Sequence, residues 1–297
     1  MTLKNNMSLS SSKNSVQHWQ RVNWHEAAAC AIEIELRDYA DRLQLLTEYV
    51  LGKNSYRIDM LIIKKLSGQA IPKNIAYIFK KYNLFEIKGI HSSLSVSSYY
   101  KGIGYAGLLV EQLNNIDSMQ YSALDFSITF LTFCYPMKLI RHLTEERNLV
   151  VAKKADGIYY ISIETFDIQI IVTQKLPPEE NLYLRCLTNG LRDSTLINRL
   201  IDDYAQHQNQ DIYIKYMNQL TIANMKAEGE SPMVCEGILN LCGTSSAEII
   251  AKTRKESEAQ IRELSESVAQ LNASNESLAS QVDYLKDLLK KNNISYE

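Results

Sequence analysis

The chain has 297 residues, of which 45% are hydrophobic and 22% are charged, and its formal net charge is -2. This composition is typical of folded globular proteins and excludes a chain that is disordered throughout. The nearly balanced charge excludes a uniformly basic nucleic-acid binder, so any surface for a polyanion has to be a local patch.

The N-terminal residues and the cysteines indicate in which cellular compartment the protein is expected. The first fifteen residues are polar, without the apolar centre of a secretion signal, and no stretch approaches 18 consecutive apolar residues. We expect residues 1–18 to be disordered, no membrane span, and a cytoplasmic location. The five cysteines show no C-x-x-C pair and mostly lie in apolar runs, so we expect reduced, buried thiols.

Residues 19–147 have the pattern of an α/β domain. Hydrophobic spacing and turn residues predict elements in the order helix, hairpin, strand, helix, strand, helix. They are a helix over 24–41, strands over 43–51 and 56–63 joined at Gly52, a helical segment over 71–82, a strand over 83–89, a helix over 94–113, a strand over 127–135 and a helix over 136–146. The glycines of the 94–113 helix predict close packing on a sheet.

The remainder divides into three parts. Residues 148–242 are expected to form an α+β region of unknown role, with a small antiparallel meander after residue 149 and mostly helical residues after 179. We expect residues 243–247 to be a linker and residues 248–292 to form a coiled coil.

The coiled-coil prediction depends on a heptad pattern. Apolar residues alternate in steps of three and four, with β-branched residues at a, leucine at d and one asparagine at a, which favours two parallel strands. The seam is Ile261, Leu264, Val268, Leu271, Asn275, Leu278, Val282, Leu285 and Leu289. We therefore expect a homodimer; the alternative is a lone amphipathic helix packed on the core, although the stripe is narrow for that role.

Three charged residues in the N-terminal third of the chain are candidates for a catalytic site. Asp59 lies in the second predicted strand, and Glu86 and Lys88 lie two apart in the third, so strand alternation places the last two on one face. A pair of carboxylates binds hard divalent cations such as Mg2+, with Mn2+ as a substitute, and a lysine beside it can orient water and stabilise charge on phosphorus. The alternative for Glu86 and Lys88 is an ordinary ion pair on a sheet.

The runs RIDMLIIKK, NLFEIKG and SVSSYYKGIGYAGLL, with the order of elements around them, resemble the PD-(D/E)XK nuclease superfamily. More narrowly they resemble an uncharacterised bacterial family of that superfamily, related to transposon-encoded nucleases. The resemblance covers roughly residues 24–145 and implies a restriction-endonuclease-like core, a mixed sheet flanked by helices. It also implies that Asp59 and Glu86 are metal ligands and Lys88 is the catalytic lysine.

The resemblance implies further site residues. Members of the superfamily often add a glutamate from the first helix, for which Glu26, Glu33 and Glu35 are available and Glu35 is preferred. Several relatives carry a Q-x3-Y pair on the helix after E-x-K; Lys101 and Tyr105 stand at that spacing, so glutamine is replaced by a phosphate-binding residue. Ile58 stands where the superfamily usually has proline.

Lysine distribution also suggests a polyanionic substrate. Between residues 60 and 110 there are seven lysines and one acidic residue, Glu86, in a chain that is net acidic. The lysines are Lys64, Lys65, Lys73, Lys80, Lys81, Lys88 and Lys101. Lys64 and Lys65 are expected to join Lys101 and Tyr105 in binding substrate; the alternative is an ordinary solvated face. The five histidines have no mutual spacing that suggests a site, so we expect surface or packing roles for them.

Two functions follow from these expectations. The first is a Mg2+-dependent DNA endonuclease of mobile-element descent, in which Asp59 and Glu86 hold the metal and Lys88 assists the attacking water. The second is a non-catalytic scaffold with a nuclease fold, whose coiled coil recruits partners.

Overall fold

A computed structural model of the chain describes residues 22–52, 56–65, 70–116, 119–163 and 165–225, together with single residues and short runs between 262 and 291. It divides into two units, Met1–Cys242 and Gly243–Glu297. The predicted disordered start at 1–18 and the predicted linker at 243–247 lie outside the described residues.

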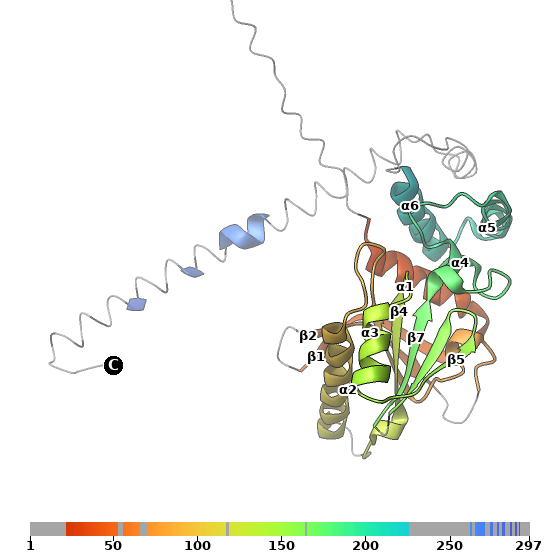
Figure 1. The fold of residues 1–297 in the computed structure, drawn as a ribbon. Coiled ribbons are helices and arrows are strands. Elements are labelled where there is room, and N and C mark those ends of the chain that lie inside the picture. Colours follow the sequence, from red (N-terminus) through yellow and green to blue (C-terminus); the bar gives the residue numbers. More distant parts are fainter. Residues whose placement is uncertain are drawn as a thin grey trace, which may run out of the picture. The chain divides into compact units, whose positions relative to one another are not determined.

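The first unit contains one seven-stranded mixed sheet and is an α/β structure (Figure 1). Its strands are β1 (Leu43–Leu51), β2 (Tyr56–Lys64), β3 (Tyr82–Ile87), β4 (Phe126–Thr132), β5 (Val151–Ala155), β6 (Ile158–Ser162) and β7 (Asp167–Val172). Its α-helices are α1 (Trp24–Glu35), α2 (Val96–Ile116), α3 (Met137–Arg141), α4 (Leu182–Cys186), α5 (Ser194–His207) and α6 (Asp211–Met225). The predicted α/β class is therefore confirmed.

The strand order is β1-β2-β3-β4-β7-β6-β5. β1, β2 and β3 are antiparallel neighbours, whereas β3 with β4 and β4 with β7 are parallel. The antiparallel meander predicted after residue 149 is present as β5, β6 and β7. Parallel pairing of β7 with β4 joins this meander to the main sheet, so the sheet continues across the boundary that the sequence suggested at residue 147.

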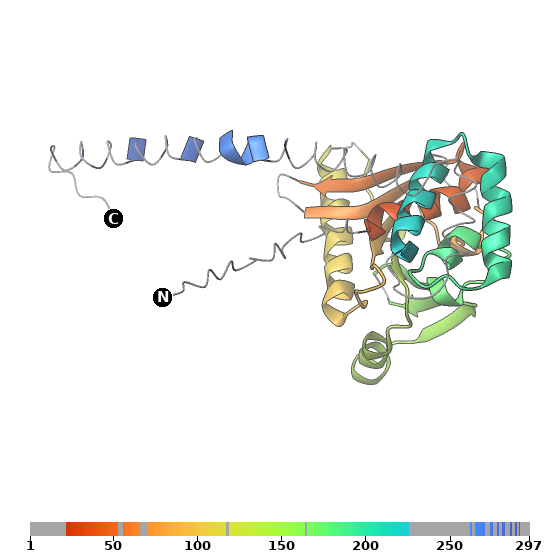
Figure 2. The same ribbon diagram turned by 90° about the horizontal axis from the view of Figure 1, so that it is seen from above.

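Helices cover both faces of the sheet. On one face, α2 and α3 pack on sheet residues such as Leu84, Ile128 and Phe130. On the other, α1, α4, α5 and α6 pack on residues such as Met60 and Phe85. Figure 2 shows α1 beside α6, which it contacts. The result is a three-layer α/β/α arrangement with a hydrophobic core on each side of the sheet.

The helix predicted over residues 71–82 is wrong, because the structure has only a short 3-10 turn at Asn74–Ala76. Side chains elsewhere bind the backbone groups that a helix would pair internally. Gln169 donates to the carbonyl oxygen of Ile75 at 2.8 Å, and Asn83 accepts from the N–H of Lys80 at 2.7 Å. Tertiary contacts thus replace the helical bonds of this segment.

The helix predicted over residues 136–146 is present as α3 followed by a π-helical turn at His142–Glu146. The close packing predicted for the glycines of α2 is confirmed at Gly102, where a Cβ atom would lie 2.7 Å from the Phe130 ring. Gly104 and Gly107 have no such neighbour within 4 Å.

In the second unit, the seam residues Val268, Leu278 and Val282 belong to helical positions and are exposed, by 53%, 54% and 47%, whereas Leu289 is partly buried. Pairing of this segment with a second copy stays a prediction. Among the described residues, no helix combines the length and the apolar character needed to cross a membrane.

Candidate functional site

The candidate site lies where strands β2 and β3 stop pairing. The last pair of this ladder is Met60 with Phe85, so Asp59 and Glu86 are the next residues on the two strands. Asp59 bridges the widening gap with its side chain, since its Oδ2 atom accepts a hydrogen bond from the N–H of Ile87 at 2.6 Å. The local splay of the strands therefore brings two carboxylates together at the edge of both cores.

Glu86 is the centre of a compact ion-pair cluster. Its side chain is 5% exposed, and its Oε1 atom accepts from both Lys88 Nζ and Lys101 Nζ, each at 2.7 Å. Lys88 comes from the end of β3 and Lys101 from α2, and the Lys101 ammonium group also lies 5.0 Å from the centre of the Tyr105 ring. Two cations around one buried carboxylate leave a net positive group that can meet a phosphate.

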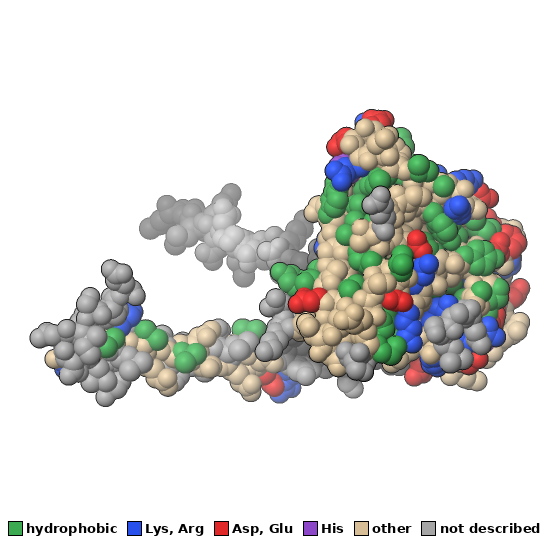
Figure 3. Space-filling view, turned by 90° about the horizontal axis from the view of Figure 1, so that it is seen from below, with side chains coloured by type: hydrophobic (Ala, Val, Ile, Leu, Met, Phe, Trp, Pro, Cys, Tyr) green, Lys and Arg blue, Asp and Glu red, His purple; other side chains and the backbone are tan. Residues whose placement is uncertain are grey.

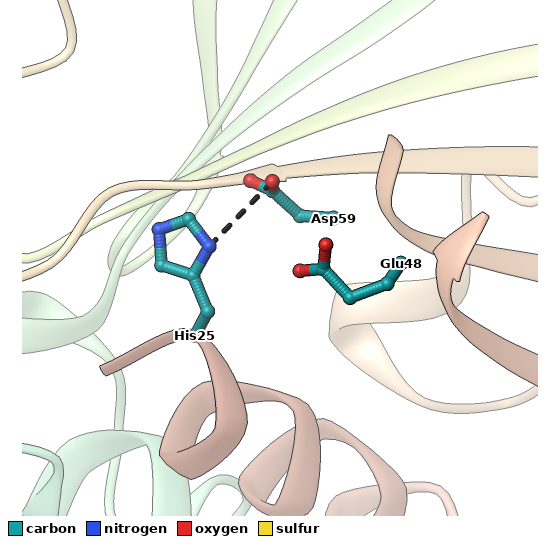
Figure 4. Close-up of side chains that lie close together, drawn as sticks. All are labelled: His25, Glu48 and Asp59. Atoms are coloured by element: carbon teal, nitrogen blue, oxygen red, sulfur yellow. Dashed lines mark ion pairs between the residues drawn. The ribbon is translucent and has the colours of Figure 1, made fainter. Parts of the chain in front are cut away.

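Helix α1 approaches the same place from the opposite layer. A Cβ atom on Gly89 would lie 3.0 Å from the Cβ atom of Trp24, so the absence of a side chain at Gly89 lets the start of α1 pack closely on the chain leaving β3. His25, the next residue, consequently faces Asp59, with 3.6 Å between its Nδ1 atom and Asp59 Oδ1 (Figure 4).

Glu48 completes this group from β1. It lies opposite Asp59, between the paired residues Thr47–Met60 and Tyr49–Ile58. Its φ of 51° interrupts the strand in a conformation that non-glycine residues rarely adopt. One ligand atom from each of His25, Glu48 and Asp59 lies within 4.8 Å of the others (Figure 4). The three residues could together hold a cation.

Burial and charge both act on Asp59. Burial raises the pKa of the Asp59 carboxyl, and the nearby Glu86 carboxylate raises it further, while the Ile87 N–H, His25 and Lys101 offset part of the effect. For Lys101, the hydrogen bond and attraction to Glu86 outweigh burial and raise the pKa of its ammonium group. A carboxylate whose charge is disfavoured in this way is one that a bound cation would stabilise.

The structure brings together Asp59, Glu86, Lys88, Lys101 and Tyr105, as the sequence analysis expected; their catalytic and binding roles stay predictions. It does not place Glu35 with them. Glu35 accepts from Lys73 Nζ at 2.8 Å and from the N–H of Tyr183 at 2.7 Å. Ten helical residues separate it from His25, a rise of about 15 Å. Glu35 is therefore a structural residue and not the catalytic glutamate that the sequence analysis expected.

The other two glutamates of α1 also face elsewhere. Glu26 accepts from Gln219 of α6 at 3.0 Å, and burial raises the pKa of Glu33 while Lys215 of α6 lowers it. The residue that α1 directs at Asp59 is His25.

Lys64 and Lys65 are likewise not near the site. Lys64 is five strand residues from Asp59, about 17 Å, and is buried, which lowers the pKa of its ammonium group. Lys65 donates to the carbonyl oxygen of Ala40 at 3.1 Å. The substrate-binding role expected for both is not supported by their positions.

The lysine-rich segment does not form one continuous basic face. Four of its seven lysines pair with carboxylates: Lys73 with Glu35, Lys80 with Asp167, and Lys88 and Lys101 with Glu86. On the face seen in Figure 3, basic side chains occur in separate groups with acidic and hydrophobic side chains between them. Local positive charge is instead concentrated at Glu86, where two of the lysines meet.

Sequence reasoning missed Glu48 and His25. Glu48 had a usable signal, because extending the predicted hairpin from its turn places it opposite Asp59. His25 had none, since only the packing of Trp24 on Gly89 brings α1 to this point. His25 is exposed, in keeping with the surface role expected for the histidines, and its Nδ1 atom also lies 3.6 Å from Asp59 Oδ1.

Comparison with known proteins adds no identification, as no family of proteins, no curated protein and no solved structure matches the chain.

Proposed function

We propose that the protein is a divalent-metal-dependent phosphodiester hydrolase that acts on nucleic acid, with DNA as the expected substrate. The observation that carries the proposal is the meeting of Asp59, Glu86 and Lys88 at one splayed strand junction, with Lys101 beside them. Neighbouring carboxylates for a cation and ammonium groups for a phosphate are the groups that phosphodiester hydrolysis requires.

The order of elements supports the resemblance to the PD-(D/E)XK superfamily. α1, the β1-β2-β3 antiparallel strands, α2 and the parallel β4 follow one another in the chain as a restriction-endonuclease-like core would have them. The E-x-K residues occupy β3 and its end, beside the Asp of β2. Descent from a mobile element is part of the same proposal.

The residues suit distinct roles. A divalent cation, Mg2+ or Mn2+ as its substitute, would lower the pKa of a bound water and neutralise charge on the phosphate. Asp59 would supply a ligand oxygen to the cation, and Glu86 holds the ammonium groups of Lys88 and Lys101 in place. When a phosphate enters, these two lysines can bind its oxygens, with Lys88 positioned to orient water at the phosphorus atom.

Dimerisation through the C-terminal heptads would supply two such sites for two DNA strands. The described thiols of Cys30, Cys134 and Cys186 are free, and we place the protein in the cytoplasm, where thiols stay reduced.

The second candidate is a non-catalytic scaffold, and one observation favours it: both lysines are already bound to Glu86, as in a structural ion pair. A cleavage assay distinguishes the hydrolase from the scaffold. Plasmid DNA is incubated with the full chain and Mg2+ or Mn2+, and nicking is compared among wild type, Lys88→Ala, and the Asp59→Ala, Glu86→Ala double variant. Lys138→Ala, on the exposed side of α3, is the control.

We expect nicking by wild type and by Lys138→Ala and at least a hundredfold loss in the other two variants. Folded wild-type protein that leaves single-stranded, double-stranded and supercoiled DNA intact with either metal would instead support the scaffold.

A further inference from the structure

The group formed by His25, Glu48 and Asp59 differs from the carboxylate pair suggested by the sequence. Its ligand atoms lie within 4.8 Å of one another, so some point is within about 2.8 Å of all three. Metal-ligand distances near 2.1 Å then require each side chain to move inward by at most about 0.7 Å. The half-exposed His25 and exposed Glu48 allow such movement by side-chain rotation alone.

The ligand atoms of this group are available to a cation. Asp59 uses Oδ2 for the Ile87 N–H, and its Oδ1 atom faces His25 at 3.6 Å. Two ligand atoms that share an ion at 2.1 Å lie about 3.0 to 3.4 Å apart, depending on geometry, which is close to this distance. Glu48 pairs with Arg57 at 3.6 Å, but both side chains are more than half exposed, so the pair is weak.

Glu86 is a poorer ligand than the sequence implied. Its Oε1 atom is bound by two ammonium groups, and a cation there would have to compete with both. At the group beside Asp59 the competing cation is Arg57, whose pair with Glu48 is longer and exposed, whereas the two lysines form their ion pairs with Glu86.

The chemistry of the ligands determines which ion fits. Mg2+ prefers oxygen ligands and keeps most of its waters, whereas an imidazole nitrogen favours first-row transition metals. One imidazole with two carboxylates suits Mn2+ or Zn2+, and the exposure of the group leaves positions for water or a phosphate oxygen.

We propose that His25, Glu48 and Asp59 form a binding site for a first-row transition-metal ion, which they bind in preference to Mg2+. The inference deepens the proposed function by naming its metal and rests on that function for the role of the ion, although binding itself can be measured without any substrate.

The test is calorimetric titration of the full chain with Mn2+, Zn2+ and Mg2+ separately. Wild type is compared with His25→Ala and Glu48→Gln, and with His91→Ala as the matched control, because His91 is an exposed histidine that is not one of the three ligands. We expect Mn2+ and Zn2+ to bind wild type at least tenfold more tightly than Mg2+. Removing either ligand should weaken Mn2+ binding tenfold or more, and His91→Ala should leave it unchanged.

A spectroscopic measurement identifies the ligand directly. Pulsed electron paramagnetic resonance of the Mn2+ complex should show coupling to an imidazole nitrogen in wild type and His91→Ala and no such coupling in His25→Ala. Equal affinity for Mn2+ and Mg2+, or unchanged Mn2+ binding by His25→Ala, overturns the inference.

The two proposals fail differently. Tight, His25-dependent Mn2+ binding without DNA cleavage would support the metal site and refute the hydrolase. Mg2+-supported cleavage that needs Lys88 but not His25, with no His25-dependent Mn2+ binding, would support the hydrolase and refute this site.

Discussion

Glu35 permits a test of whether a buried carboxylate has a structural or a catalytic role, and we expect Glu35→Gln and Glu35→Ala to behave very differently. The Glu35 side chain is 6% exposed and accepts from the N–H groups of Tyr183 and Leu184, at 2.7 and 3.5 Å, and from Lys73 at 2.8 Å. Alanine removes all three bonds. Glutamine keeps an oxygen for the two N–H groups, but its NH2 group cannot accept from Lys73, so the charge and the Lys73 bond are both lost.

The magnitudes follow from these contacts. A buried N–H left without a partner costs about 1 to 3 kcal/mol, and Lys73 loses its partner but is 17% exposed and still donates to the carbonyl oxygen of Glu180. We therefore expect Glu35→Ala to lower the free energy of unfolding by about 2 to 4 kcal/mol. Glu35→Gln should be within about 1 kcal/mol of wild type or more stable.

The pH dependence of the free energy of unfolding shows whether the Glu35–Lys73 ion pair outweighs the cost of burying the Glu35 carboxylate. Burial raises the pKa of the Glu35 carboxyl, and Lys73 and the two N–H groups offset only part of this effect. The folded state therefore holds this proton more tightly than the unfolded chain does. Its contribution to stability is greatest below the unfolded pKa of about 4.3 and decreases as pH rises through the interval up to the higher folded pKa.

Chemical denaturation of wild type and Glu35→Gln at several pH values between 4 and 8 measures this contribution. The two should be similarly stable at pH 4, and Glu35→Gln should gain relative to wild type as pH rises. If glutamine instead becomes the less stable of the two with rising pH, the ion pair outweighs the cost of burial and the reasoning is wrong. Mn2+ binding should be the same in both, and its loss in Glu35→Gln would return Glu35 to the site.

Three further predictions concern packing, charge and assembly. Gly102→Ala should lower the free energy of unfolding by about 1 to 3 kcal/mol, because its Cβ atom would lie 2.7 Å from the Phe130 ring. Gly104→Ala, where a Cβ atom meets nothing within 4 Å, should raise the free energy of unfolding by about 0.5 to 1 kcal/mol. Equal effects of the two substitutions in thermal denaturation would contradict the packing argument. Arg57→Gln should tighten Mn2+ binding by about two- to fivefold in calorimetry, because it frees Glu48 from an opposing cation. Weaker Mn2+ binding by Arg57→Gln would contradict this argument. The full chain should sediment as a dimer and the Leu278→Glu, Val282→Glu variant as a monomer, because both seam side chains are about half exposed in the single chain. A variant that still sediments as a dimer would place the interface elsewhere.

The amino-acid sequence alone determined most of the first half of the fold. Alternating apolar residues and the turn at Gly52 set the hairpin of β1 and β2, and the glycine-containing run after residue 94 set α2. These patterns are local, and each element buries the face that its own periodicity defines. The neighbourhood of Asp59, Glu86 and Lys88 was predictable for the same reason, since the residues lie on consecutive strands.

Only the tertiary structure decided the rest, because the deciding contacts join residues far apart in the chain. Parallel pairing of β7 with β4 extended the sheet, and the Ile75 carbonyl oxygen, in the segment expected to be a helix over residues 71–82, accepts instead from Gln169. The polar partners of Glu35, from Lys73 and α4, removed it from the site. The close approach of Trp24 to Gly89 brought His25 to Asp59, a contact that helical periodicity cannot predict because it depends on how one layer packs on another.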